Sequence, residues 1–255
     1  MGILDRFSLE GKTALVTGAG RGIGRGLALA FAEAGADVAL NARTESELKA
    51  VAKEVEALGR RAAVITGSVE TVDGARGIVE QTVGQLGRLD VLLTAAGTAI
   101  RRPAEEVTKE QFERQVNVNV RGTYFCCQAA GQHMLERGSG SIITIGSLTT
   151  SFGLPLRSVY AATKGAVGQL TKTLAVEWGA RGVRVNCIAP GWIHTPLTQP
   201  LFDNPEVSGW IVGRTPMGRW GTPEDLQGVA VYLASDAAAF VTGQVHYIDG
   251  GFIVA

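Results

Sequence analysis

Seven apolar runs recur along the chain, and neighbouring runs are separated by stretches long enough for a helix. They cover residues 12–17, 37–41, 62–66, 89–94, 141–145, 183–188 and 244–248. Runs that are apolar at nearly every position are typical of parallel strands buried on both faces. Strands that alternate with helices imply right-handed crossovers. The pattern predicts one α/β domain over residues 1–255, with a mainly parallel, doubly wound seven-stranded sheet covered by helices on both faces.

Helix-start signals fit this alternation. Thr44–Glu47 and Thr108–Gln111 have the capping-box pattern, and Thr222 is followed by a proline and two acids. Long helices are expected over 118–132 and 161–178. The segment 192–221 is rich in Pro, Trp and Gly and does not fit the alternation. A long irregular segment in a compact domain is usually functional, and we expect it to be a substrate lid.

Composition narrows the possible partners. The 255 residues carry 24 basic and 24 acidic side chains without a basic run, which argues against nucleic acid as a partner. No apolar run approaches the ~18 residues that span a bilayer, and the N-terminus lacks a signal-peptide core. Three cysteines and three scattered histidines indicate reduced thiols and no zinc site. We expect a cytoplasmic protein that acts on a small molecule, with no membrane partner and no metal.

Two positions suggest acid/base chemistry. Tyr160 and Lys164 are four residues apart in an Ala-rich segment, so a helix would place them on one face. An ammonium group beside a phenol stabilises the phenolate, which makes the phenol a usable acid/base. Ser147 follows the apolar run at 141–145, where a strand would deliver its hydroxyl at the carboxyl end. A solvated lysine beside a half-buried tyrosine is the alternative for the pair taken alone.

A glycine motif lies between the first strand and a helix near Arg25. Gly18, Gly22 and Gly24 lack side chains, so the backbone can approach a pyrophosphate at the start of that helix. A tight turn that needs glycine only for its dihedral angles is the alternative. The spacing Gly-x3-Gly-x-Gly departs from the G-x-G-x-x-G dinucleotide pattern.

Together these motifs resemble the short-chain dehydrogenase/reductase family over essentially the whole chain. The matching pieces are Gly18, Gly22, Gly24, Thr94–Gly97, Asn119, Ser147, Tyr160, Lys164, Pro190–Gly191, Thr195, Thr242–Gln244 and Asp249–Gly251. The resemblance implies a Rossmann domain and hydride transfer between a nicotinamide and a carbonyl. It also implies a homotetramer or homodimer, because the two long helices form subunit contacts in the family.

The resemblance also implies residue roles. Tyr160 would exchange the proton with the substrate oxygen, Lys164 would hold the nicotinamide ribose, and Ser147 would donate a hydrogen bond to the oxygen. Asn119 would keep a water in a proton relay, with Asn117 as its competitor. Further cofactor contacts are expected at Ile23, Val69, Ala96, Gly97, Pro190, Gly191, Ile193 and Thr195.

The choice of cofactor depends on the end of the second strand. Ala42 stands where NAD-preferring relatives carry Asp, Arg43 follows it, and Arg21 lies in the glycine loop. Two guanidiniums would bind an adenosine 2′-phosphate, so we expect NADP(H), with NAD(H) also usable. Ala95 and Ser68 depart from the family pattern, and each departure removes a hydrogen bond worth about 1 kcal/mol.

Within the family, similarity is greatest to sugar-acid and polyol oxidoreductases such as gluconate 5-dehydrogenases. Arg101 and Arg102 follow the fourth strand, where one of them can pair with a carboxylate. The expected pocket walls are apolar and suit a hydrophobic ketone better: Leu148, Leu154, Trp192, Leu197, Phe202 and Trp210. A 3-oxoacyl-[acyl-carrier-protein] reductase and a non-catalytic cofactor-bound regulator are the alternatives.

Overall fold

The computed structural model, which describes residues 2–255, contains a seven-stranded sheet in which every pair of neighbours is parallel. The order is β3-β2-β1-β4-β5-β6-β7. The strands are β1 (Thr13–Thr17), β2 (Asp37–Ala42), β3 (Ala62–Thr66), β4 (Val91–Thr94), β5 (Gly140–Ile145), β6 (Val183–Pro190) and β7 (Val245–Ile248). All seven predicted strands are confirmed to within two residues at each end. The predicted doubly wound α/β fold is confirmed.

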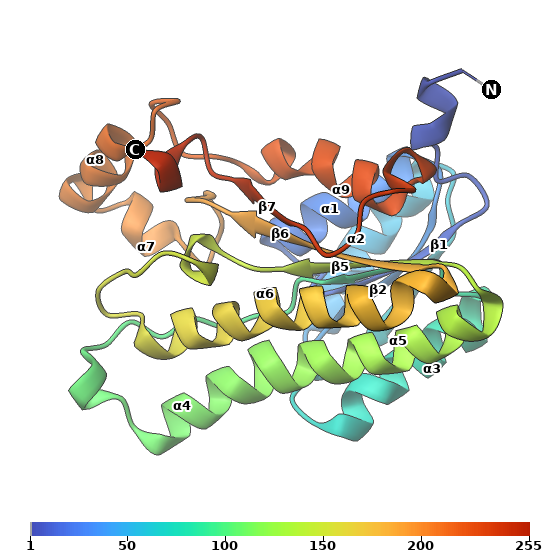
Figure 1. Cartoon of the computed structure of the whole chain (residues 1–255), viewed down its shortest axis with the longest axis horizontal. Coiled ribbons are helices and arrows are strands. Elements are labelled where there is room, and N and C mark those ends of the chain that lie inside the picture. The colour runs from blue at the N-terminus through green and yellow to red at the C-terminus, as the bar shows by residue number, and fades with distance from the viewer. Residues whose placement is uncertain (1) are drawn as a thin grey trace.

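Helices cover both faces of the sheet, as Figure 1 shows. One layer consists of α1 (Gly22–Glu33), α2 (Glu45–Ala57) and α9 (Gln227–Ala234). The other consists of α3 (Val72–Leu86), α5 (Thr123–Arg137) and α6 (Ser158–Trp178), with α4 (Lys109–Val116) leading into α5. Two short helices, α7 (Gln199–Phe202) and α8 (Pro205–Arg214), lie beyond one end of the sheet. Within residues 2–255, every helix is too short or too polar to span a bilayer.

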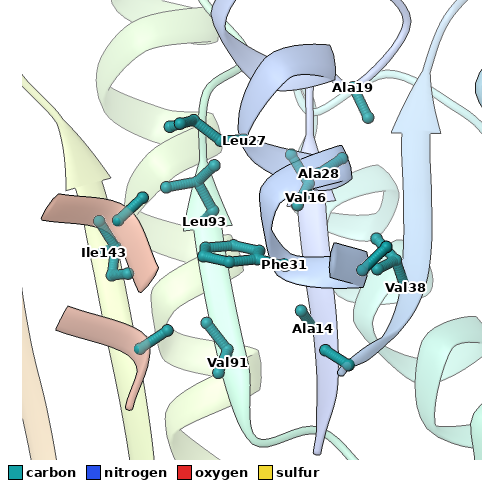
Figure 2. Close-up of a cluster of buried hydrophobic side chains, with 14 of the residues drawn as sticks. Ala14, Val16, Ala19, Leu27, Ala28, Phe31, Val38, Val91, Leu93 and Ile143 are labelled. Carbon is teal, nitrogen blue, oxygen red and sulfur yellow. The ribbon is translucent and has the colours of Figure 1, made fainter. Parts of the chain in front are cut away.

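Two hydrophobic cores form because successive strand residues point to opposite faces of the sheet. Val16 of β1 faces α1, whereas its neighbour Leu15 packs with α3 and α5. In Figure 2, Phe31 of α1 lies against the central strands, close to Leu93. Phe31 is fully buried, which contributes about 1.5–3 kcal/mol relative to an exposed ring. These contacts fix where the first strand and the first helix meet.

An ion-pair network ties the amino end of the sheet together. Asp90 accepts a hydrogen bond from the backbone N–H of Thr13 at 2.9 Å, and it pairs with Arg88 and Arg137. Its side chain is only 9% exposed. Burial opposes ionisation, but the Arg88 hydrogen bond and the other partners outweigh it and lower the pKa of the Asp90 carboxyl. The network lies at the edge opposite the carboxyl ends of the strands, so it stabilises the fold away from the site.

Three local predictions need correction. The helix expected at 118 begins nine residues earlier at Lys109 and reaches Arg137 through a π-helical stretch, Asn117–Gly122. The capping box at Thr108 is present, but Thr44 makes no side-chain cap because Glu47 reaches toward the glycine loop. The segment 192–221 is not irregular throughout, because it contains α7 and α8, and the N-terminal end of α8 is capped by Asn204. Short helices with Pro in their first turn are difficult to recognise from periodicity alone.

Candidate active site

The candidate site lies at the carboxyl ends of the strands, around the point where the strand order reverses. The chain leaves β1 toward β2 and β3 on one side, and continues from β4 to β7 on the other. The loops after β1 and β4 therefore diverge and leave a crevice, which is where open α/β sheets bind their ligands. The glycine motif, Thr94–Gly97, Ser147 and Pro190–Gly191 all follow strands at this edge.

The glycine loop is packed so closely that side chains are excluded. Gly18 has φ +70°, and a Cβ atom added there would lie 2.8 Å from the backbone nitrogen of Ala96. A Cβ on Gly24 would lie 2.2 Å from the carbonyl oxygen of Gly18. Helix α1 begins at Gly22 without a side-chain cap from Arg21, so its first N–H groups remain free to bind an anion. This cradle fits the pyrophosphate of a dinucleotide, which requires bare backbone at this place.

The loop after β6 closes the crevice from the other side. The N–H of Gly191 donates to the carbonyl of Ile248 at 2.9 Å, which continues the β6–β7 pairing beyond Pro190. Ile193 is buried, and a Cβ built on Gly22 would lie 3.4 Å from Cβ of Thr195. The predicted phosphate loop and the predicted nicotinamide-binding loop therefore meet. Ile23, on the first turn of α1, packs against the core below them.

Two arginines flank the position where an adenosine ribose would lie. Arg21 is 3.7 Å from Glu47, and Arg43 is 3.9 Å from Glu70. Both guanidiniums are about two-thirds exposed, so these long ion pairs are weak. Ala42, at the end of β2, places no acid beside them. A phosphate can therefore compete for both arginines.

The two departures from the family pattern are accommodated differently. Near Ala95, the hydroxyl of Thr17 accepts a hydrogen bond from Ala96 N–H at 3.2 Å, which links β1 to the end of β4. Ser68 accepts from the N–H of Glu70 at 3.3 Å and stabilises its own turn. Val69, next to Ser68, is buried against Gly122. A Cβ atom on Gly122 would lie only 2.7 Å from the Val69 side chain, so a larger residue has no space at position 122.

Tyr160 and Lys164 lie on one turn of α6, with the Lys164 ammonium 5.7 Å from the centroid of the Tyr160 ring. The ammonium donates to the carbonyl of Ile145, the last residue of β5, at 2.7 Å. The hydroxyl of Thr150 accepts from Ser147 N–H at 3.1 Å and donates to the carbonyl of Lys164 at 3.3 Å. These bonds fix α6 to the segment that carries Ser147. Lys164 is 94% buried, in contrast to the solvated lysine of the alternative interpretation.

Asn119 and its competitor Asn117 differ clearly in their surroundings. Asn119 is buried, and its amide donates to the carbonyl of Thr98 at 2.9 Å and to the hydroxyl of Thr163 at 3.1 Å. In return, the N–H of Thr98 donates to Oδ1 of Asn119 at 2.9 Å. Thr98 follows Gly97 in the loop after β4, and Thr163 precedes Lys164, so Asn119 connects this loop with α6. The π-helical stretch that contains it is the kind of helix irregularity found at functional sites.

The predicted pocket walls form part of an aromatic cluster at the end of β6. Trp192 contacts Trp220 and Phe252 edge-on, and Phe202 stacks on His194. Trp210 also packs edge-on against Phe252. The other three predicted wall residues are leucines and differ in exposure. Leu148 is buried, Leu154 is half-buried and Leu197 is 59% exposed. The cluster connects α7 and α8 to the end of the sheet.

Sequence reasoning missed two charged residues at the site. Glu47 lies beside the glycine loop, where a Cβ on Gly20 would be 2.8 Å from its carboxylate. Arg157 lies in front of α6, with its guanidinium carbon 5.9 Å from the centroid of the Tyr160 ring and 5.3 Å from that of Trp192. The spacing of three residues between Arg157 and Tyr160 was the available signal, because such positions share a helix face.

Comparisons with known proteins find relatives over almost the whole chain. A family profile described as "Enoyl-(Acyl carrier protein) reductase" matches residues 18–253. The 2-dehydro-3-deoxy-D-gluconate 5-dehydrogenase of Pseudoalteromonas atlantica is 43% identical over 98% of this chain and 99% of its own length. The gluconate 5-dehydrogenase of Gluconobacter oxydans is 41% identical over 98% of both chains.

Solved structures agree with these relatives. A gluconate 5-dehydrogenase from Burkholderia cenocepacia, crystallised in complex with NADP and tartrate, superposes with a TM-score of 0.96. It is 38% identical, and the match covers 100% of both chains. The strand order, the glycine cradle and the relatives lead to one conclusion: the chain belongs to the short-chain dehydrogenase/reductase family, as its motifs predict.

Proposed function

We propose that this protein is an NADP(H)-dependent oxidoreductase that interconverts a ketone and a secondary alcohol on a sugar acid. The observation that carries the proposal is the pairing of Tyr160 with the buried Lys164 at the carboxyl end of β5. This pair lies on the same edge of the sheet as the glycine cradle. An acid/base group and a dinucleotide cradle at one edge suit hydride transfer coupled to proton transfer.

The proposed proton chemistry uses three side chains. When bound, the nicotinamide supplies or accepts the hydride. Tyr160 donates its phenolic proton to the carbonyl oxygen during reduction and takes it back during oxidation. The nearby ammonium of Lys164 favours the phenolate that remains. Ser147 donates a hydrogen bond to the same oxygen, where negative charge develops in the transition state.

Lys164 has a second proposed task, which its fixed position supports. Its bond to the Ile145 carbonyl fixes the ammonium at the carboxyl end of β5, where Lys164 would hold the nicotinamide ribose of a bound cofactor. Asn119 connects the loop after β4 to α6 through Thr98 and Thr163. We assign Asn119 the task of holding the water of the proton relay.

The cofactor preference is assigned to Arg21 and Arg43. Their ion pairs with Glu47 and Glu70 are long, both guanidiniums are exposed, and β2 ends in Ala42 rather than an acid. The relative from Burkholderia cenocepacia was crystallised with NADP, which supports the same choice. NAD(H) remains usable, because the remaining contacts involve groups that both cofactors share.

The substrate class is assigned from the relatives and from one cation. Two similar proteins act on gluconate or 2-dehydro-3-deoxy-D-gluconate, as their names state. Arg102 is engaged with Glu106 at 3.6 Å, whereas Arg101 has no ion pair within the described chain. Of the two, Arg101 is therefore the one free to add positive charge on the side from which an anionic substrate approaches. Residues 192–221 are proposed to close over the substrate, and we propose a homotetramer or homodimer in the cytoplasm.

Acyl-thioester reduction is the second candidate, and the description of the matching family profile is what favours it. A panel of ketones, sugar acids and 3-oxoacyl thioesters, followed at 340 nm with NADP(H), separates the two. We expect turnover of a sugar acid and none of the thioesters. Replacing Tyr160 by Phe should abolish turnover while NADP+ binding, measured by fluorescence quenching, stays within about twofold. Turnover retained in Tyr160→Phe would contradict the proposed acid/base.

A further inference from the structure

Arg157 is a cation without a partner next to the proposed acid/base. It precedes the first turn of α6, and its guanidinium lies over the rings of Tyr160 and Trp192. Within residues 2–255 its side chain has no hydrogen bond and no carboxylate within 4.0 Å. The side chain is half-buried, and burial lowers the pKa of its guanidinium, an effect that the nearby Tyr160 opposes.

Such an arrangement is costly for the apo protein. A guanidinium presents five N–H donors in a rigid plane, and a buried one is normally paired with a carboxylate. Even the more exposed Arg102 and Arg219 have carboxylate partners, Glu106 at 3.6 Å and Asp225 at 2.7 Å. Arg157 faces aromatic rings instead, and Arg101 adds a second positive charge near it. Two like charges without a local acid leave a strong preference for an incoming anion.

The backbone in front of Arg157 is strained in a way that fixes its position. Leu156 has φ +62°, the one positive φ of a non-glycine residue among residues 2–255. This left-handed conformation is unfavourable for a residue with a Cβ. The carbonyl of Leu156 accepts a hydrogen bond from the N–H of Arg102 at 3.0 Å. The loop after β4 thus holds the turn that presents Arg157 to the site.

We infer that Arg157 is a specificity-determining residue that binds the carboxylate of the substrate while the reacting carbon lies at Tyr160. The inference rests on the proposed function and names the part of the site that recognises the acid. A planar guanidinium binds a carboxylate through two parallel hydrogen bonds. Trp192 and Tyr160 on one side of it exclude water, which strengthens that bond.

This assignment also resolves the conflict between a polar substrate and apolar pocket walls. The aromatic cluster around Trp192 need not contact the hydroxyl groups of a sugar acid. It forms the low-dielectric side of the arginine, and the carboxylate neutralises the charge there. A neutral polyol of the same length gains nothing from Arg157 and leaves it unpaired.

The experiment measures binding of D-gluconate and of tartrate to the NADP+-saturated protein by calorimetry, with every variant made on a Tyr160→Phe background that binds but does not oxidise the substrate. The variants are Arg157→Gln, Arg157→Lys and, as a matched control nearby, Arg102→Gln, whose arginine already pairs with Glu106. We expect Arg157→Gln to weaken the binding of both carboxylates about 10- to 100-fold and Arg157→Lys to weaken it less. The affinities of Arg102→Gln should stay within about twofold of the values for Tyr160→Phe alone. Melting temperature and NADP+ affinity verify that each variant is folded. If Arg157→Gln does not fold, Arg157→Lys decides, because it keeps the charge and loses the planar fork.

Turnover separates this inference from the proposed function. With D-sorbitol, which has an alcohol in place of the carboxylate, kcat/KM should be the same for wild type and Arg157→Gln, while the KM for gluconate rises. If Arg157 has only a structural role, Arg157→Gln will lower kcat/KM equally for gluconate and for sorbitol. That result would overturn the inference. The inference would also be overturned if the wild-type enzyme bound neither gluconate nor tartrate, or if Arg102→Gln weakened their binding as much as Arg157→Gln does. A wild type that binds gluconate through Arg157 without oxidising it would refute the proposed function and leave the carboxylate site intact.

Discussion

Replacing Arg43 by Gln tests how the protein chooses between its two possible cofactors. The guanidinium of Arg43 follows β2, is 64% exposed, and lies 3.9 Å from Glu70. Gln keeps a polar side chain but is shorter and removes the charge. The change therefore affects a 2′-phosphate far more than the two ribose hydroxyls of NAD+.

The magnitude follows from two opposing contributions. A hydrogen bond from a charged group to phosphate contributes about 1.5–3 kcal/mol. Breaking the long, exposed pair with Glu70 when phosphate binds costs about 0–1 kcal/mol. With the middle of each range, the net contribution of Arg43 is about 1.8 kcal/mol, which corresponds to a rise of about 20-fold in KM for NADP+.

Initial rates with NADP+ and NAD+ at saturating substrate give kcat/KM for each cofactor. Arg43→Gln should lower the value for NADP+ by that factor and change the value for NAD+ by less than about twofold. Glu70→Gln is the matched control, because it removes the competing acid and should leave NADP+ binding equal or tighter. A wild type that prefers NAD+, or an equal loss for both cofactors in Arg43→Gln, would refute the reasoning.

Two further substitutions test the cradle and the fold. Gly24→Ala places a Cβ 2.2 Å from the Gly18 carbonyl, so we expect NADP+ affinity to fall more than about 10-fold in calorimetry. Gly77→Ala, on α3 with nothing within 4 Å of its Cβ, should leave that affinity unchanged. Asp90→Asn should lower the free energy of unfolding by about 2–4 kcal/mol at pH 7 in urea titrations. Because the folded-state pKa of Asp90 is lowered, its stabilisation is present above the unfolded pKa and is lost as pH falls through the folded pKa. The difference between the two proteins should shrink below about pH 4, and a difference that does not depend on pH would contradict the argument.

The sequence predicted the fold well because its signals are local and repeated. Most strand positions are apolar, and each of the first six strands is followed by a helix, which leaves only a parallel sheet covered on both faces. The glycine motif was equally informative, because the Cβ atoms that it lacks have no space in the folded loop. Tyr160 and Lys164 were predicted to share a helix face from their spacing of four residues, and α6 places them so.

Predictions that depended on which partner a side chain finds were less successful. Thr44 and Glu47 have the capping-box pattern, yet Glu47 extends toward the glycine loop and the box does not form. The sequence favoured Asn119 over Asn117 for the proton relay, but it could not show which partners Asn119 has. In the structure the π-helical stretch brings Asn119 to Thr98 and Thr163.

What the sequence by itself determined was therefore the order of the elements, the edge of the sheet where chemistry is placed, and the residue types available there. Only the tertiary structure decided how the charges are distributed among them. Arg102 found Glu106, whereas Arg157 was left over two aromatic rings without an acid. The physical reason is that periodicity acts between neighbours on one element, whereas the pairing of charges depends on loops that tertiary packing brings together.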